Sequence, residues 1–238
     1  MTATDRARIL EVLRKGEMEV LGRMPRASNV TLAVRLTLDD ADALAVYKPQ
    51  AGESPLWDFP EGTLYRREVA AFLVSESTGF GFVPPTVSRA GVYGVGSVQL
   101  AVAEEPAEHY LTLMPAHAET FRRVCAFDVA VNNADRKSGH CMIERETGSI
   151  RVIDHGTCFG VQDKLRTVIW DFAGERLPDE VRGGLDRFLS DAACARALTA
   201  FLAADEIAAT RARTEALLRA DRFPDPPEDR RPYPWPPI

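Results

Sequence analysis

The chain has 238 residues, of which 45% are hydrophobic, and its formal net charge is -6. This length suits one large domain or two small lobes that share a cleft, and the apolar content is enough for a sizeable core. Because an acidic chain is a poor non-specific partner for nucleic acid or for an anionic membrane surface, we expect no nucleic-acid binding.

Two features of the sequence bear on its location. No apolar run is long enough to span a bilayer, and the charged stretch MTATDRARILEVLRKG lacks the uninterrupted apolar core of a signal peptide. The four cysteines are scattered and form no Cys-x-x-Cys pair. We therefore expect a cytoplasmic protein with no integral membrane association, and buried thiols rather than disulfides.

The first part of the chain is expected to combine two helices with a small antiparallel sheet. Helical periodicity, followed each time by a glycine, predicts helices over 3–15 and 64–78. A loop over 50–63 separates the first pair of strands from the second helix. Apolar runs bounded by turn residues predict four strands, at 29–38, 43–48, 83–88 and 97–103.

After Glu104-Glu105-Pro106 the pattern becomes mainly helical. Helices are predicted over 118–131, 179–190 and 192–220, and one hairpin is predicted from Cys141–Ile143 and Ile150–Ile153. We place a lobe boundary at this change. It divides the chain into three parts: an N-lobe of 1–104, a C-lobe of 105–222 and an extended proline-rich tail of 223–238.

The strongest chemical signal is a pair of segments, VNNADRKSGH at 131–140 and IRVIDHG at 150–156. The first places Asp135 in a polar loop after a helix, and the second places Asp154 directly after a strand. Phosphoryl transfer needs one carboxylate that orients the attacking hydroxyl and a second that holds the metal bridging the phosphate oxygens. The two segments therefore favour a phosphotransferase, with Asp135 as the candidate catalytic residue and Asp154 as the candidate metal ligand.

A second group of candidates lies upstream. Lys48 ends a predicted strand and Glu68 lies near the start of the next helix. A strand lysine held by a helix glutamate can neutralise the phosphates of ATP. The last strand of the predicted N-lobe runs into Glu104, where the backbone of a hinge could pair with an adenine edge. Taken alone, Lys48 is typical of a solvated strand end and Glu68 of a helix surface, so both roles depend on the order of the segments.

Seven short segments follow one another in a characteristic order. They are YKP at 47–49, REVAAFLV at 67–74, VPPTV at 83–87, GSVQLAVAE at 96–104, DVAVNNADR at 128–136, IRVIDHG at 150–156 and WDFA at 170–173. In that order the segments resemble the phosphatidylinositol 3-/4-kinase-like family, above all the type II phosphatidylinositol 4-kinases, and more distantly the HipA-type kinases. The chain is also similar to an actinobacterial group of lipid-kinase-like proteins, which implies no particular substrate.

The resemblance implies an α+β, two-lobed, protein-kinase-like fold that has a mixed N-lobe with an antiparallel sheet and a mainly helical C-lobe. It implies ATP and Mg or Mn as cofactors. In this reading Lys48 contacts phosphates, Glu68 orients Lys48, Asp135 is catalytic and Asp154 binds the metal. Asn133, two residues before Asp135, would support the catalytic residue.

Two departures from the family pattern matter. His140 stands where kinase-like sites usually carry an asparagine that binds a second metal, and imidazole suits Mn or Zn better than Mg. No glycine-rich loop precedes Lys48, so residues 26–31 would have to cover the phosphates. Ser28 and Asn29 are the expected donors there.

Several alternatives stay open. The expected reaction is transfer of the γ-phosphoryl group of ATP to a hydroxyl of a protein, a small molecule or a lipid headgroup. A soluble acceptor is favoured because the sequence has no polybasic stretch and no cysteine cluster suited to palmitoylation. His140 instead favours a nucleotide-binding pseudokinase or scaffold, and kinase-like folds can also transfer AMP or join glutamates. The sequence does not predict an oligomeric state.

Four further side chains have two possible interpretations each. Asp128, on the apolar face of its helix, is expected to be a buried structural acid, and His155 is expected to pack. Lys164 and Arg166 could meet an anionic acceptor or be solvated. A zinc site built from two histidines and two cysteines around the hairpin is disfavoured, because the cysteines lie in apolar runs.

Overall fold

The computed structural model describes residues 3–25 and 29–238. Within these ranges the chain forms a five-stranded sheet, a separate two-stranded hairpin and six α-helices. The helices are α1 (Ala3–Lys15), α2 (Leu64–Ser77), α3 (Tyr110–Val131), α4 (Asp179–Ser190), α5 (Ala192–Leu198) and α6 (Ala204–Ala220). The strands are β1 (Glu17–Arg23), β2 (Leu32–Leu38), β3 (Ala41–Pro49), β4 (Thr86–Gly91), β5 (Gly94–Leu100), β6 (Cys141–Ile143) and β7 (Ile150–Val152).

The large sheet has the strand order β1-β2-β3-β5-β4, and every neighbouring pair is antiparallel. β2 and β3, which correspond to the first two predicted strands, form a hairpin with Asp39 in the left-handed conformation at its turn (φ 56°). β3 is the central strand, and Lys48 lies near its end opposite Ser97 of β5. The sheet therefore places this lysine where the strand leaves the sheet towards α2.

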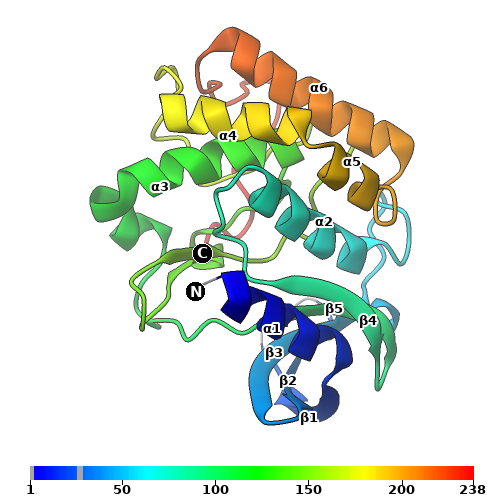
Figure 1. Cartoon of the computed structure of the whole chain (residues 1–238). Coiled ribbons are helices and arrows are strands. Elements are labelled where there is room, and N and C mark those ends of the chain that lie inside the picture. The colour runs from blue at the N-terminus through cyan, green and yellow to red at the C-terminus, as the bar shows by residue number, and fades with distance from the viewer. Residues whose placement is uncertain (1–2, 26–28) are drawn as a thin grey trace.

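Figure 1 shows α1 beside the sheet at one end of the molecule, α3, α4 and α6 at the other end, and α2 between them. Two hydrophobic clusters correspond to this arrangement. In the first, Val12 and Leu13 of α1 pack against the sheet at Val34 and Leu36, and all four are fully buried. The second cluster joins the buried face of α2 to the C-terminal helices. α2 is thus packed on the larger core although it precedes the predicted lobe boundary, and the boundaries at 104 and 222 stay a prediction.

β1 and the first part of α3 were not predicted from the sequence. β1 is an edge strand with exposed glutamates and a bulge between Val20 and Gly22, so its apolar alternation is weak. α3 begins at Tyr110 rather than at residue 118. It contains Pro115, and the backbone at His117 is not helical (φ -126°). This interruption explains why the sequence pattern predicted that the helix begins only at residue 118.

The predicted helix over 192–220 is two helices. Asp191 caps the start of α5, because its carboxylate accepts hydrogen bonds from the N–H groups of Ala193 (3.0 Å) and Cys194 (2.9 Å). It ends near Leu198, and α6 begins at Ala204. The predicted helices 3–15, 64–78 and 179–190 and the hairpin at 141–153 agree with the structure to within a residue or so.

The expected α+β architecture, with a mixed N-terminal part and a mainly helical C-terminal part, is confirmed. All four cysteines are free and buried, as predicted. Among the residues that the structure describes, no helix is both long enough and apolar enough to cross a bilayer.

Candidate active site

The ammonium group of Lys48 lies between two carboxylates. It forms an ion pair with Glu68 Oε1 and lies 3.0 Å from Asp154 Oδ1. The second oxygen of Glu68 accepts a hydrogen bond from the backbone N–H of His155 at 3.0 Å. The central strand, α2 and the segment after β7 therefore meet at Lys48 and Glu68.

The charges of this cluster support one another. Burial opposes the charge of Lys48, but the carboxylates of Asp154 and Glu68 outweigh burial and raise the pKa of the lysine. In turn, Lys48 holds the pKa of Asp154 far below its usual range. Lys48 and Asp154 are thus a charged pair at neutral pH, and the Asp154 side chain is still 48% exposed.

Asp154 has a left-handed backbone (φ 62°), which aspartate and asparagine tolerate better than most side chains. The conformation turns the chain immediately after β7 and directs the carboxylate to Lys48. His155 then turns into the core, where it is fully buried and packs edge-on against Phe127 with ring centroids 5.6 Å apart. The predicted packing role of His155 is confirmed.

His140 faces Asp154. Its Nε2 lies 3.4 Å from Asp154 Oδ2, and its Nδ1 accepts a hydrogen bond from the backbone N–H of Lys137 at 3.3 Å. Burial lowers the pKa of His140 to about 4, so the ring is neutral at physiological pH. A neutral ring whose Nδ1 is an acceptor carries its proton on Nε2, and it presents an N–H rather than a lone pair to Asp154. To serve as a metal ligand through Nε2, His140 would have to give up its bond to Lys137.

The loop that follows α3 presents Asp135. Its backbone N–H donates to Asn133 Oδ1 (3.0 Å), and Asn133 Nδ2 donates in turn to Asp128 Oδ1 (3.0 Å). The Asp135 carboxylate is about one-third exposed and lies 3.1 Å from Lys137 Nζ. Burial raises the pKa of Asp135, and Lys137 partly offsets the rise. The carboxylate of Asp135 is thus a stronger base than that of Asp154.

Arg136 lies within the segment DVAVNNADR, but no role was predicted for it. Its side chain connects the loop of Asp135 to the segment of Asp154. Its guanidinium is fully buried and forms an ion pair with Asp128 at 3.0 Å. It also donates to the carbonyl of Ile153 (2.8 Å) and contacts His155 Nε2 (2.8 Å). The loop of Asp135 is therefore fixed to the segment that carries Asp154. Asp128 is the buried structural acid that was predicted. Its position on an apolar helix face was the sequence signal that a buried cation would pair with it.

Arg67 performs a similar task for α2. It is 1% exposed, donates to the carbonyl of Cys158 (2.8 Å) and pairs with Glu206 of α6 (2.5 Å). Because Arg67 is adjacent to Glu68, this buried pair anchors to the C-terminal helices the part of α2 that meets Lys48. Sequence reasoning missed it, since Glu206 is far away along the chain.

Of the two residues predicted to cover the phosphates, the structure describes one. Ser28 lies outside the described residues. Asn29 accepts a hydrogen bond from the backbone N–H of Ser54 at 2.7 Å, so its amide oxygen links its own segment to the loop after β3.

The predicted hinge contact at Glu104 has a different environment from the one expected. The N–H of Glu104 donates to Val102 O (2.9 Å), and its carbonyl accepts from Arg145 Nη2 (3.2 Å). The carbonyl of Ala103 is likewise bonded to the N–H of Arg145 (2.9 Å). Within the described chain, the neighbouring N–H groups of Val102 and Ala103 have no hydrogen-bond partner. The unpaired backbone N–H groups of this segment are therefore one and two residues before Glu104.

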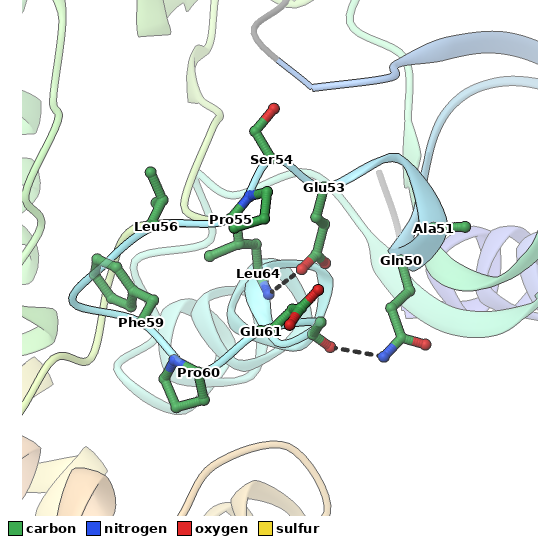
Figure 2. Close-up of a pocket in the computed structure, with 11 residues that line it drawn as sticks. Gln50, Ala51, Glu53, Ser54, Pro55, Leu56, Phe59, Pro60, Glu61 and Leu64 are labelled. Carbon is green, nitrogen blue, oxygen red and sulfur yellow. Dashed lines mark hydrogen bonds between the residues drawn. The ribbon is translucent and has the colours of Figure 1, made fainter.

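A cavity of about 450 Å³ lies within the loop between β3 and α2 (Figure 2). Glu53 closes one side and accepts hydrogen bonds from the N–H groups of Leu64 (3.0 Å) and Tyr65 (2.7 Å), which caps α2. Gln50 donates to the carbonyl of Gly62 at 3.0 Å on another side. Lys48, Glu68, Asp135 and Asp154 do not line this cavity, which lies at the start of the Glu68 helix rather than at the lysine.

The side chains of the candidate site could hold a metal ion only together with the phosphates of a nucleotide. Among the described residues, no group of three or more His, Cys, Asp or Glu side chains could hold an ion by itself. Mg²⁺ bound with nucleotides takes one or two carboxylates and completes its shell with phosphate oxygens and water. The half-exposed carboxylate of Asp154 fits that requirement.

This fold and this arrangement of a strand lysine, a helix glutamate and two loop aspartates define a two-lobed, protein-kinase-like chain. The fold is similar to that of the Golgi casein kinase with Mn/ADP bound, with a TM-score of 0.58 and 14% identity over 92% of this chain and 76% of that one. It is also similar to hydra Fam20 (TM-score 0.56, 12% identity, 92% and 88% of the chains). The Helicobacter pylori proinflammatory kinase CtkA has a TM-score of 0.53 at 12% identity, over 89% and 94% of the chains.

At the level of sequence, the chain belongs to the same family as Protein Rv2133c of Mycobacterium tuberculosis (strain ATCC 25618 / H37Rv). The two are 39% identical over an alignment that covers 94% of each chain. No protein-family model matches the chain. The kinase-like fold implied by the predicted resemblance is thus supported, and the narrower likeness to phosphatidylinositol kinases stays a prediction.

Proposed function

We propose that this protein is an ATP-dependent phosphotransferase. The observation that carries the proposal is the position of Lys48 between Glu68 and Asp154, with Asp135 held nearby on a separate loop. The first three groups match what a nucleotide phosphate and its metal require, and Asp135 supplies a base with a raised pKa.

In the proposed reaction, the acceptor hydroxyl oxygen attacks the γ-phosphorus of ATP. The bond between that phosphorus and the bridging oxygen breaks, ADP leaves, and the hydroxyl proton passes to Asp135. Lys48 binds phosphate oxygens, and Glu68 keeps Lys48 in place. A divalent cation, Mg or Mn, would be held by Asp154 and the phosphates and would supply neutralisation of their negative charge.

The adenine would lie against the hinge, where the N–H groups of Val102 and Ala103 are candidate donors in place of the Glu104 backbone. Asn29 and Ser28 remain proposed contacts for the phosphates. For His140, the geometry favours a donor that orients Asp154 over a second metal ligand. The acceptor is a hydroxyl of a protein, a small molecule or a lipid headgroup.

One observation favours a second candidate, a nucleotide-binding pseudokinase. His140 replaces the asparagine that usually binds a second metal and points an N–H at Asp154. Such a protein would bind ATP and lack turnover.

The test is a calorimetric titration with ATP in the presence of Mg, of Mn and of neither, followed by measurement of ADP release. Asp154→Asn is the informative variant, because asparagine keeps the left-handed backbone that alanine would strain. We expect it to lose the metal-dependent part of binding, whereas Asp135→Asn should bind ATP normally and lose turnover. Asp39→Asn is the matched control, since Asp39 is also left-handed but lies at a distant turn.

The outcomes separate the candidates. Binding with no turnover in the native chain supports the pseudokinase. Binding under no condition would refute nucleotide chemistry at this site. Intact-mass measurement of any modified product distinguishes a transferred phosphoryl group from an adenylyl group.

A further inference from the structure

The proline-rich segment 229–238, which we call the strap, lies on the loop that carries Asp135. It joins the rest of the molecule through backbone carbonyls at two of its prolines, Pro232 and Pro237. Both partners are amides close to the candidate active site. The strap is therefore attached to the catalytic face rather than spread over a distant surface.

The first attachment extends a small backbone ladder. The N–H of Arg136 donates to the carbonyl of Arg166 (3.0 Å), and the N–H of Val168 donates to the carbonyl of Arg136 (3.1 Å). This parallel bridge leaves the N–H of Thr167 on the opposite side, where it donates to Pro232 O at 3.0 Å. The same oxygen accepts from Trp170 Nε1 at 3.2 Å. The strap is thus a third backbone segment, hydrogen-bonded beside the two segments that form the bridge.

The second attachment is on the catalytic loop itself. The N–H of Ser138 donates to Pro237 O at 2.8 Å. Ser138 lies between Asp135 and His140 and is fully buried, with its hydroxyl 3.1 Å from His109 Nδ1. The strap therefore crosses from the segment at Thr167 to the loop at Ser138 and connects the two.

The composition of the strap suits this role. Proline has no N–H, so a proline carbonyl can accept a hydrogen bond without leaving a buried donor unsatisfied, and its fixed φ keeps the segment extended. An ion pair between Arg230 and Asp163 (2.7 Å) anchors the beginning of the strap, and Pro234 is buried in its middle.

The strap leaves the reacting groups open. Asp135 remains 34% exposed and Asp154 48% exposed. In the described part of the chain, the strap forms no hydrogen bond or ion pair with either carboxylate. This distinguishes a holding element from a plug that fills the acceptor position.

We propose that residues 229–238 are a positioning strap, which fixes the Asp135 loop by holding the amides of Thr167 and Ser138 at the same time. Its effect on turnover rests on the proposed phosphotransferase function. Its effect on the loop does not, and the two can be measured separately.

The test compares three full-length chains: the native chain, Arg230→Ala combined with Trp170→Phe, and Arg231→Ala. The double variant removes both side-chain anchors of the strap. Arg231→Ala loses the same charge, but its guanidinium stacks only on Trp235 within the strap, 4.9 Å from the ring centroid. Amide hydrogen exchange at Ser138 and Thr167 should become faster by roughly tenfold or more in the double variant and stay unchanged in the control.

Turnover supplies a second readout. We expect the double variant to lower kcat for ATP consumption with little change in KM for ATP, because the Lys48 cluster is not touched. Should Trp170→Phe prevent folding, a protease site inserted between the exposed residues Glu228 and Asp229 allows the strap to be cut after the chain has folded.

Unchanged exchange at Ser138 and Thr167 after release of the strap, or equal changes in the Arg231 control, would overturn the proposal. A rise in turnover would overturn it too, because it would identify the segment as an inhibitor. Absence of turnover in the native chain counts against the phosphotransferase, while the exchange measurement still decides whether the strap holds the loop.

Discussion

Lys48 Nζ lies 3.0 Å from Oδ1 of Asp154, the residue proposed to hold the metal. The lysine thus neutralises the Asp154 carboxylate, and Glu68 contacts the same ammonium group from α2. With a nucleotide bound, Lys48 would contact its phosphates, and a metal held by Asp154 would supply the positive charge beside that carboxylate. The two residues are therefore expected to be strongly coupled in binding.

Lys48→Met should weaken ATP binding by about 100-fold, or ~3 kcal/mol, because it removes the phosphate contact and leaves two carboxylates without their cation. Calorimetry in the presence of Mg measures the change. Lys15→Met is a suitable control, since Lys15 is 66% exposed and pairs only within α1. Unaltered affinity in Lys48→Met would remove this lysine from the site.

The parts of this site that follow local rules were predictable. Lys48 ends an apolar strand, Glu68 lies near the start of an amphipathic helix, and Asp154 follows a short strand, so the order of elements located them. The helices 3–15 and 64–78 were predictable because each has helical apolar periodicity and a glycine directly after it.

The parts that depend on distant partners were not predictable. Arg67 is buried only because Glu206 reaches it from α6, and nothing near either residue indicates that pairing. The tail was predicted to be extended, but its contacts were not predictable, because they use backbone carbonyls and amides that no side-chain pattern reveals. The backbone carbonyl of Glu104 accepts a hydrogen bond from Arg145, and the sequence does not indicate that these distant residues are neighbours.

Asp128→Asn should lower the free energy of unfolding by roughly 3–5 kcal/mol, because it leaves the buried guanidinium of Arg136 without a counter-charge. Denaturation by guanidinium chloride measures this loss. Glu105→Gln breaks an exposed pair with Arg145 and should cost less than about 0.5 kcal/mol. If the two variants were equally stable, the Asp128–Arg136 pair could not be what fixes the loop.

His140 should make stability pH-dependent in the absence of metal. Its folded-state pKa is about 4, below the ordinary value of 6.5, because the ring is buried. The unfolded chain therefore binds more protons between these two values, so stability is fully present above pH 6.5 and is lost as the pH falls towards 4. The loss attributable to His140 is roughly 3 kcal/mol.

The His140→Asn variant isolates this contribution. Its free energy of unfolding should fall less steeply than that of the native chain between pH 6.5 and 4, and the two curves should run parallel above pH 7. Identical slopes in the acidic window would show that His140 titrates normally in the folded protein.

Lys137→Met should move the acid limb of the kcat profile to higher pH. Asp135 must be deprotonated to accept the hydroxyl proton, and burial already raises its pKa above the ordinary carboxyl value. Lys137, 3.1 Å away, lowers that pKa, so its removal raises the pKa further and activity is lost at a higher pH as the solution is acidified. The position of the limb is the readout, because it does not depend on the height of the alkaline plateau, and Lys15→Met should leave it in place. A limb that stays fixed or moves to lower pH in Lys137→Met would mean that a group other than Asp135 accepts the proton.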